Sequence, residues 1–282
     1  GGVTLCALVA VMRRRGRMPR VATVLAVIGV LGYVASVAGV RAAQVLTRPA
    51  DWQIAMCDVG QGDATLVRSA GRVALIDTGP DPALLRACLD DLGVGVVDLL
   101  VVTHDDLDHV GGTDAVVGRV GTVLVGPLAA PGDQQRRDTL RAGGARVIQA
   151  RAGMSGTLGD LDWQALWPPQ RGVEPGNPAS IAIRVTPGPE CAPCLSALLL
   201  GDLGEESQNR MRAAESLRPV DVLKVAHHGS GDFSAQLYAD AAAVVALIGV
   251  GVDNTYGHPT DAALEALEAS GIAFEIVRHG PV

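Results

Sequence analysis

The sequence predicts a layered α/β fold preceded by one transmembrane helix. From Trp52 onward, short apolar runs of strand length alternate with longer segments of helical pattern, as in a mixed α/β sandwich. Before them lie twenty consecutive residues without a charge. A hydrophobic fraction of 48%, an aromatic fraction of 3% and 35 glycines also indicate a packed α/β protein rather than a disordered chain.

The uncharged run at 21–40 is long enough to cross a bilayer as a helix. Residues 1–12 resemble the end of a preceding span. Five arginines lie between the two runs, whereas only Arg41 and Arg48 follow the second. The positive-inside rule therefore places the arginine loop in the cytoplasm and the part after residue 50 on the outer face. The same arginines disfavour the alternative, a buried hairpin of a soluble protein.

The chain opens with Gly1 inside an apolar run, so we interpret it as a fragment of a longer polypeptide. Residues 1–48 are expected to form the end of a membrane domain, with its span at about 21–40, and residues 50–282 a separate domain.

In this second domain, apolar runs bounded by Gly, Pro and Asp predict strands, and helical periodicity predicts helices, one of them starting at Pro82. Strands are expected at 53–58, 65–68, 73–77, 97–103, 122–125, 146–149, 161–166, 180–186, 195–200, 221–226, 243–249 and 272–277. Helices are expected at 82–92, 133–142, 205–215, 234–241 and 260–270. The stretch 170–194 is rich in Pro and Gly and is expected to be largely loop.

The charge is unevenly distributed. Residues 1–48 hold seven of the 23 basic residues and none of the 30 acidic ones, so the remainder holds 16 basic and 30 acidic residues, a net charge of −14. Such an acidic domain disfavours broad, salt-driven binding to nucleic acid.

The strongest motif is His104-Asp105-Asp106-Leu107-Asp108-His109, followed by Gly111-Gly112. Two histidines and up to three carboxylates fall within six residues, directly after a predicted strand. Neutral imidazole and carboxylate groups suit divalent ions such as zinc and manganese, and the glycines allow a sharp turn. A charged strand-to-helix cap is the alternative, but it would not require two histidines.

Three distant segments also end an apolar strand with polar groups. Asp77 follows Leu75-Ile76, Asp202 follows Leu199-Leu200-Gly201, and His227-His228 follow Val225-Ala226. Each alone is ordinary, because Asp at a strand end is usually a turn former. Together they place acids and imidazoles at strand ends, where α/β folds keep their sites.

These residues resemble the pattern of the metallo-β-lactamase superfamily. More narrowly, they resemble the C-terminal domain of ComEC-type DNA-internalisation (competence) proteins, over about residues 50–280. The supporting motifs are Asp58-Val59-Gly60-Gln61-Gly62-Asp63, His227-His228-Gly229-Ser230 and Asn254-Thr255-Tyr256-Gly257-His258-Pro259.

The resemblance implies an αββα metallo-β-lactamase sandwich with a metal site at one edge of its sheets. His104 and Asp106 would bind one ion. Asp108, His109 and His227 would bind a second, Asp202 would bridge the two, and Asp77 would orient a ligand. His228 is the alternative to His227, because one sequence cannot choose within a His-His pair. His258 would lie near the site, within reach of a phosphate oxygen, although a helix-entry loop explains it equally well.

The sequence departs from the superfamily pattern twice. Asp106 stands where the second histidine of the motif is usual, and no histidine occurs between His109 and His227. Asn177 or Ser180 falls where the third histidine motif would lie. The first metal position is therefore rich in oxygen ligands, which favours Mn²⁺ or Mg²⁺, with Zn²⁺ as the alternative, and one or two ions in total.

Other residues have bland explanations. A tight turn accounts for Gln61 and Asp63 as well as substrate contact does, and Lys224 is expected to be structural. Cys191 and Cys194 are expected in a loop between two strands, with a local disulfide if the compartment is oxidising.

The resemblance implies a metal-dependent phosphodiester hydrolase, a nuclease that degrades DNA outside the cytoplasmic membrane during transformation. Asp108 or Asp202 would accept the proton of the attacking water. Its partners would be DNA, the membrane channel domain of the same polypeptide and other DNA-uptake proteins. Two alternatives remain: a membrane-anchored hydrolase of a small ester or phosphodiester, and a non-catalytic scaffold with a degenerate metal site.

Overall fold

The computed structural model describes residues 20–47, 51–189, 191 and 193–279. The chain divides into two compact units, Gly1–Ala50 and Asp51–Val282, and each is described by itself.

In the first unit, α2 (Arg20–Thr47) contains the whole of the predicted span at 21–40. Across the described part of the chain, no helix is long and apolar enough to cross a membrane. The predicted transmembrane span is therefore not supported by the structure. The predicted preceding span at 1–12, and the arginine run up to residue 19, lie outside the described residues.

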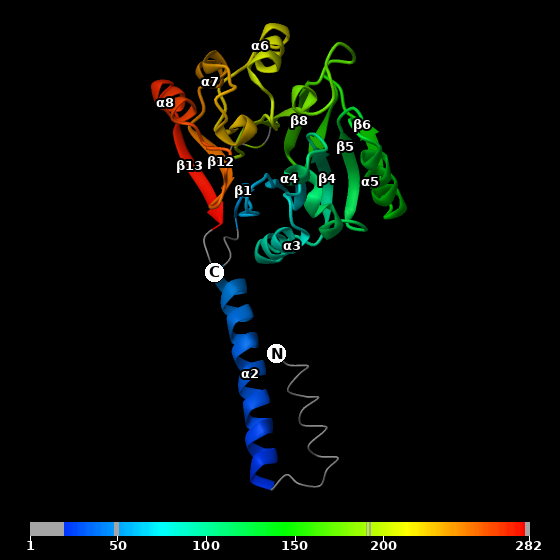
Figure 1. Ribbon diagram of the computed structural model, residues 1–282, viewed down its shortest axis with the longest axis vertical. Helices are drawn as coiled ribbons and strands as arrows, with labels where there is room; N and C mark the ends of the chain where they lie inside the picture. The colour runs from blue at the N-terminus through cyan, green and yellow to red at the C-terminus, as the bar shows by residue number, and fades with distance from the viewer. Residues whose placement is uncertain (1–19, 48–50, 190, 192, 280–282) are drawn as a thin grey trace. The chain divides into compact units, whose positions relative to one another are not determined.

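The second unit contains two sheets, each covered by helices on one face (Figure 1). The first sheet has six strands in sequential order, antiparallel at its start and parallel from β3 onward. Its strands are β1 (Ile54–Met56), β2 (Thr65–Ser69), β3 (Arg72–Ile76), β4 (Val97–Val102), β5 (Val120–Val125) and β6 (Arg146–Gln149). The intervening helices are α3 (Pro82–Asp91), α4 (Leu107–Val110), the 3₁₀ helix η1 (Gly111–Ala115) and α5 (Pro131–Ala142).

The second sheet has seven strands, also in sequential order, antiparallel from β7 to β10 and parallel from β10 to β13. They are β7 (Ser155–Leu158), β8 (Leu161–Trp167), β9 (Ala182–Pro187), β10 (Ala197–Leu199), β11 (Val222–Lys224), β12 (Val245–Gly251) and β13 (Ala273–His279). Between them lie η2 (Asn177–Ala179), α6 (Glu205–Ala214), η3 (Ala226–Gly229), α7 (Ala235–Ala241) and α8 (Asp261–Ala269).

Alternation along the strands divides the core into three apolar layers, because successive side chains point to opposite faces of a sheet. In β3, Leu75 packs toward α3, whereas Ala74 and Ile76 pack toward the second sheet. In β10, Leu198 packs with α6 and α7, whereas Leu199 faces the first sheet. Figure 1 shows α5 outside β5 and β6 and α8 against β13. The layers are therefore helix, sheet, sheet and helix, and the expected αββα metallo-β-lactamase sandwich is confirmed.

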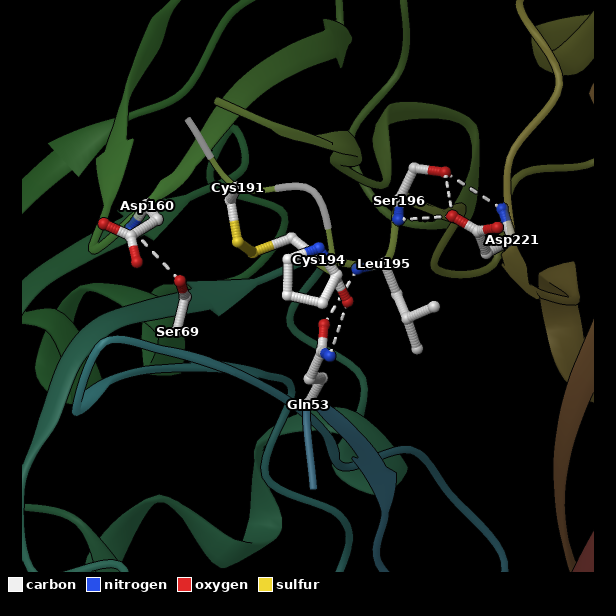
Figure 2. The surroundings of a disulfide bond; sticks show 9 residues. Gln53, Ser69, Asp160, Cys191, Cys194, Leu195, Ser196 and Asp221 are labelled. Carbon is white, nitrogen blue, oxygen red and sulfur yellow. Dashed lines mark hydrogen bonds between the residues drawn. A yellow bond between two sulfur atoms is a disulfide. The ribbon is translucent and has the colours of Figure 1, made fainter. Parts of the chain in front are cut away.

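Two disulfides join residues of the second unit. Cys57 is buried at the end of the first strand segment and is bonded to Cys88 of α3. Cys191 and Cys194 are bonded within the connection from β9 to β10, so the expected local disulfide is present. Figure 2 shows the Gln53 side chain beside this second disulfide: its Nε2 donates to the Pro193 carbonyl and its Oε1 accepts from the Leu195 amide, each at 2.8 Å. Gln53 thus ties the start of the first sheet to the entrance of β10.

Candidate metal centre

The carboxyl ends of four parallel strands meet at one edge of the sandwich. Asp77 follows β3 and His104 follows β4 by two residues; in the second sheet, Asp202 follows β10 and His227-His228 follow β11. β3 pairs with β4, and β10 pairs with β11, so these side chains start out as neighbours within each sheet. The two halves of the chain each supply one side of the site.

The local backbone is left-handed at three of these positions. Asp77, His227 and His228 have φ values of 62°, 51° and 55°, a region that non-glycine residues rarely occupy. Such conformations persist where the surrounding structure fixes them, and they cluster at functional sites. At Gly112 a side chain would collide with the Thr78 carbonyl, so only glycine lets the chain turn after His109 so close to the Asp77 loop.

His109 and His228 point their Nε2 atoms at the same two carboxylates. Oδ2 of Asp202 lies 3.3 Å from His109 Nε2 and 3.7 Å from His228 Nε2. Oδ2 of Asp108 lies 4.0 Å and 3.3 Å from the same two atoms. Because four potential donors of two kinds surround one point, this group has the composition of a divalent metal position.

The opposite nitrogen of each imidazole has a partner that fixes its tautomer. His109 Nδ1 lies 2.8 Å from Asp77 Oδ2, and that carboxylate also accepts from the amide and hydroxyl of Thr103 at 2.7 and 2.8 Å. His228 Nδ1 lies 2.8 Å from the Gly249 carbonyl. With Nδ1–H donating in both rings, each Nε2 can offer a lone pair to an ion that displaces its proton.

His104 forms the second group. Its Nε2 lies 3.4 Å from Asp106 Oδ2 and 4.0 Å from Asp202 Oδ2, so Asp202 lies between the two groups. Its Nδ1 lies 3.1 Å from the Thr103 hydroxyl and 3.2 Å from the Ser180 hydroxyl, which also accepts from the Asp202 amide. Ser180 therefore holds His104 and Asp202 together from behind rather than facing the open side.

His227, Asn177 and His258 line the open side. The His227 side chain is 30% exposed, with Nε2 3.8 Å from Asp202 Oδ2 and 3.5 Å from Asn177 Nδ2. The His258 ring lies 5.5 Å from that of His227. Its backbone is held by Asn254, whose Oδ1 accepts from the His258 amide. His228, by contrast, is almost fully buried, and of the adjacent pair it is His228 that joins His109, Asp108 and Asp202.

Two buried residues support His228 from the side away from Asp202. Asp63 Oδ1 lies 3.5 Å from His228 Nδ1, and the Asp63 carboxylate contacts the Lys224 ammonium, which also donates to the Val225 carbonyl. Asp63, His109, Asp202 and His228 have donor atoms within 4.8 Å of one another. Because the Lys224 charge already neutralises Asp63, this carboxylate serves as a support for His228.

The charges of the site shift its pKa values in opposite directions. Burial alone would lower the pKa of His109, but the carboxylates of Asp202 and Asp77 outweigh it and hold the pKa well above its ordinary value. Burial likewise opposes the protonation of His228, yet Asp63 and Asp202 raise its pKa to about 10. Burial would raise the pKa of Asp202, but His109 and His228 hold it well below its usual range. The carboxylates of the cluster therefore favour the charged form of the imidazoles, and the imidazoles favour the charged form of Asp202.

The residues fit divalent metal. The buried atoms without a hydrogen-bond partner among the described residues include four that belong to the two groups: Nε2 of His104, His109 and His228, and Oδ1 of Asp202. An unpartnered buried polar atom costs about 1–3 kcal/mol, and a metal ion would satisfy several of them at once. The ligand roles of the individual residues stay predictions.

The structure gathers all of the predicted site residues at this edge. The sequence left a tight turn and substrate contact open for Asp63 and predicted a structural role for Lys224; the structure places both residues as supports of His228. Asp63 belongs to the Asp58–Asp63 motif, and that membership was the available signal. Lys224 gave none, because a lysine in a short strand normally faces solvent.

Beside the site lies a cleft of about 700 Å³, lined by Asn177, Asp202 and His227. Glu174, Glu206 and Asp232 add negative charge to its walls, and Arg210 is its one cation among the described residues. The cleft gives access to Asp202 and His227 from solvent.

The fold and this cluster of strand-end histidines and acids define a class of protein. The Metallo-beta-lactamase superfamily matches residues 57–232, which include every predicted metal ligand. The chain therefore belongs to the metallo-β-lactamase superfamily.

Within the superfamily the chain is similar to competence proteins, which confirms the predicted resemblance to the ComEC type. It is 27% identical to ComE operon protein 3 of Bacillus subtilis, covering 79% of this chain and 31% of that protein. It is 31% identical to Competence protein ComA of Neisseria gonorrhoeae, covering 78% and 30%. It is 30% identical to Recombination protein 2 of Haemophilus influenzae, covering 82% and 28%. The chain thus spans less than a third of the length of these relatives.

Solved structures agree on the fold. The metallo-beta-lactamase fold protein YhfI of Bacillus subtilis has a TM-score of 0.51 at 14% identity, covering 82% of this chain and 99% of that one. CmlA, a diiron beta-hydroxylase from Streptomyces venezuelae, has a TM-score of 0.54 at 17% identity, covering 82% and 54%.

Proposed function

We propose that this domain is a metal-dependent phosphodiester hydrolase, a nuclease that degrades DNA on the outer face of the cytoplasmic membrane during transformation. The observation that carries the proposal is the convergence of three buried Nε2 atoms, from His104, His109 and His228, on Asp202. The names of the relatives, competence and recombination proteins, support DNA as the substrate.

Bound divalent ions would supply an activated water and stabilise the charge that develops on phosphorus. His109, His228, Asp108 and Asp202 would hold one ion, and His104, Asp106 and Asp202 the other. The Asp108 side chain is 32% exposed, whereas that of Asp202 is 4% exposed. Asp108 Oδ2 is therefore the more accessible position for taking the proton from the attacking water, and Asp202 holds the imidazoles in place.

The metal we favour is Mn²⁺, with Zn²⁺ as the alternative. The group around His104 offers one imidazole nitrogen, and its other predicted donors are carboxylates. Oxygen-rich positions suit harder ions.

The proposed location rests on two observations. The first is the excess of arginine before residue 21 compared with the few arginines after residue 40. The second is the pair of disulfides, Cys57–Cys88 and Cys191–Cys194, since disulfides persist mainly in oxidising compartments. The proposed partners are DNA, a membrane channel domain of the same polypeptide and other DNA-uptake proteins.

Incubation of the purified chain with end-labelled DNA tests the activity across Mn²⁺, Mg²⁺ and Zn²⁺. The proposal expects degradation with Mn²⁺ and none by Asp202→Ala. Degradation that survives Asp202→Ala would contradict it. Hydrolysis of small diesters but not of DNA would favour the small-substrate alternative, and no metal binding at all would favour the scaffold.

A further inference from the structure

A second cavity lies next to the cleft. It has a volume of about 310 Å³ and opens between the carboxyl ends of β5, β6 and β8 and the segment 168–179. The side chains that give it its character are Gln149, Arg151, Gln170 and Arg171.

This cavity differs from the cleft in charge. Two arginines line it and no acidic residue does, although the domain as a whole is strongly acidic. Within the described ranges, no hydrogen bond or ion pair occupies the guanidinium of Arg151 or of Arg171. Both side chains are exposed, and the two glutamines add amide N–H donors.

Arg210, the cation that lines the cleft, already has contacts within the protein. Arg210 donates to the Gly172 carbonyl at 3.0 Å, lies 3.8 Å from Glu206 and stacks over Trp167. A polyanion that reached the cleft would therefore meet mostly acidic walls, whereas the adjacent cavity presents the positive charges of Arg151 and Arg171.

Strand pairing places the cavity at the same edge of the first sheet as the metal centre. Val125 at the end of β5 pairs with Val102 of β4, two residues before His104, and also with Gln149 of β6. The cavity therefore opens at the edge of the first sheet where His104 lies. Val173 lines both the cavity and the cleft.

We propose that this cavity is a phosphate-binding subsite for a single nucleic acid strand whose scissile phosphodiester lies in the cleft. The inference rests on the proposed function and adds the path of the strand. Guanidinium groups bind phosphate oxygens through two parallel hydrogen bonds, and such contacts position a backbone without reading its sequence. The pair Arg151 and Arg171 offsets the acidic cleft at the point where the strand leaves it.

The test is the binding of fluorescein-labelled single-stranded DNA by the purified full chain, measured by fluorescence anisotropy in EDTA so that hydrolysis does not interfere. Two phosphate contacts contribute about 1.4 to the slope of log Kd against log salt, which corresponds to about 25-fold in Kd at about 0.1 M salt. In the double variant Arg151→Gln with Arg171→Gln, the salt slope should fall by about 1.4 and the Kd should rise about 25-fold. The double variant Arg151→Lys with Arg171→Lys should keep the salt slope but bind DNA less tightly than wild type. Lysine keeps the positive charge but cannot donate two parallel hydrogen bonds to one phosphate.

The matched control is Arg146→Gln with Arg278→Gln, which removes the same charge from two exposed arginines outside the cavity. This pair should stay within about twofold of wild type. Equal weakening by both pairs, or an unchanged salt slope in the Arg151 and Arg171 pair, would overturn the subsite. Hydrolysis of bis(p-nitrophenyl) phosphate and DNA by the wild-type chain is measured in parallel. If neither is cleaved with any metal while the difference in DNA binding persists, the proposed function fails and the subsite stands.

Discussion

Lys224 and Asp63 form a buried ion pair between the second sheet and the loop that precedes β2. Both side chains are about 3% exposed, and Asp63 also lies beside His228. The pair therefore has two roles: it holds Asp63 beside His228, a candidate metal ligand, and it contributes to the stability of the domain.

Replacing Lys224 with Met should destabilise the domain by about 3–5 kcal/mol, because it leaves a buried carboxylate without its partner. The double variant Asp63→Asn with Lys224→Met should recover most of that loss, since neither member of the pair is then charged. Urea unfolding of the metal-free chain measures both. Arg278→Met, an exposed cation of β13, is the control and should change stability by less than about 0.5 kcal/mol. A double variant no more stable than Lys224→Met would contradict the ion-pair explanation.

Of the adjacent histidines, His228 should matter more for metal binding. His228→Ala, like His109→Ala and Asp202→Ala, should weaken Mn²⁺ binding at least tenfold, because each removes a buried donor of the same group. His227→Ala should have a smaller effect, and His258→Ala should leave binding nearly unchanged. Calorimetric titration with Mn²⁺ decides the order. Unaltered binding in Asp202→Ala would mean that the site is wrongly assigned.

Asp77 should act through His109 without touching the ion. Asp77→Asn keeps the size of the side chain but removes the charge that holds the His109 Nδ1 proton, so Mn²⁺ affinity should fall about 10- to 100-fold. Asp98→Asn, which breaks an exposed pair with Arg72, is the matched control. Titration of both variants compares them, and equal affinities would remove Asp77 from the site.

Mn²⁺ affinity should rise with pH. The metal-free protein keeps protons on His109 and His228 above their ordinary pKa range, and for His228 the pKa is about 10. An ion must displace those protons, so binding tightens as the pH approaches 10. Calorimetry in buffers of different ionisation enthalpy should show proton release at neutral pH. Binding that is independent of pH and buffer would contradict the protonated cluster.

The stability of the metal-free chain should change with pH in the opposite direction, falling as the pH rises. Because the folded pKa values are raised, the contribution of these imidazolium groups is fully present below about pH 6.5, the unfolded value, and is lost as the pH rises through about 10. Urea midpoints across this range measure it.

The preference of the enzyme for Mn²⁺ over Zn²⁺ should depend on Asp106. With Asp106 in place, DNA hydrolysis should be stronger with Mn²⁺ than with Zn²⁺, and Asp106→His should shift the preference toward Zn²⁺, because imidazole suits that ion. The comparison of initial rates with each metal is the measurement. Equal rates with both metals in the wild-type chain would contradict the oxygen-rich assignment.

The proposed orientation predicts that tags within residues 13–20 and after Val282 report opposite sides of the cytoplasmic membrane. Cysteine accessibility or reporter fusions in cells test this. Both tags on one side would exclude the outer-face location.

Sequence periodicity anticipated most of the sandwich, since long apolar runs leave few choices for a buried strand. It missed β7, whose residues Ser155–Leu158 include few strand formers; that strand exists because β8 pairs with it. It also missed α4, a four-residue helix directly inside the metal-binding motif.

The composition of the site was predictable, and its geometry was not. Spacing identified the strand ends, yet the choice between His227 and His228 depends on two successive left-handed residues that only the tertiary structure fixes. The role of Lys224 depends on Asp63, which lies 161 positions earlier in the chain. Nor does spacing indicate that Cys57 and Cys88 meet.

The Cys57–Cys88 bond closes a segment with a sequence separation of 31, and both Asp63 and Asp77 lie inside it. In the chain-entropy description, closing a loop of that length removes about 4 kcal/mol of conformational freedom from the unfolded ensemble. The carboxylates that support His228 and His109 therefore stay within a covalently restricted ring even when the sheets have come apart. When the oxidised chain refolds, Asp63 and Asp77 are therefore already held near each other by the disulfide.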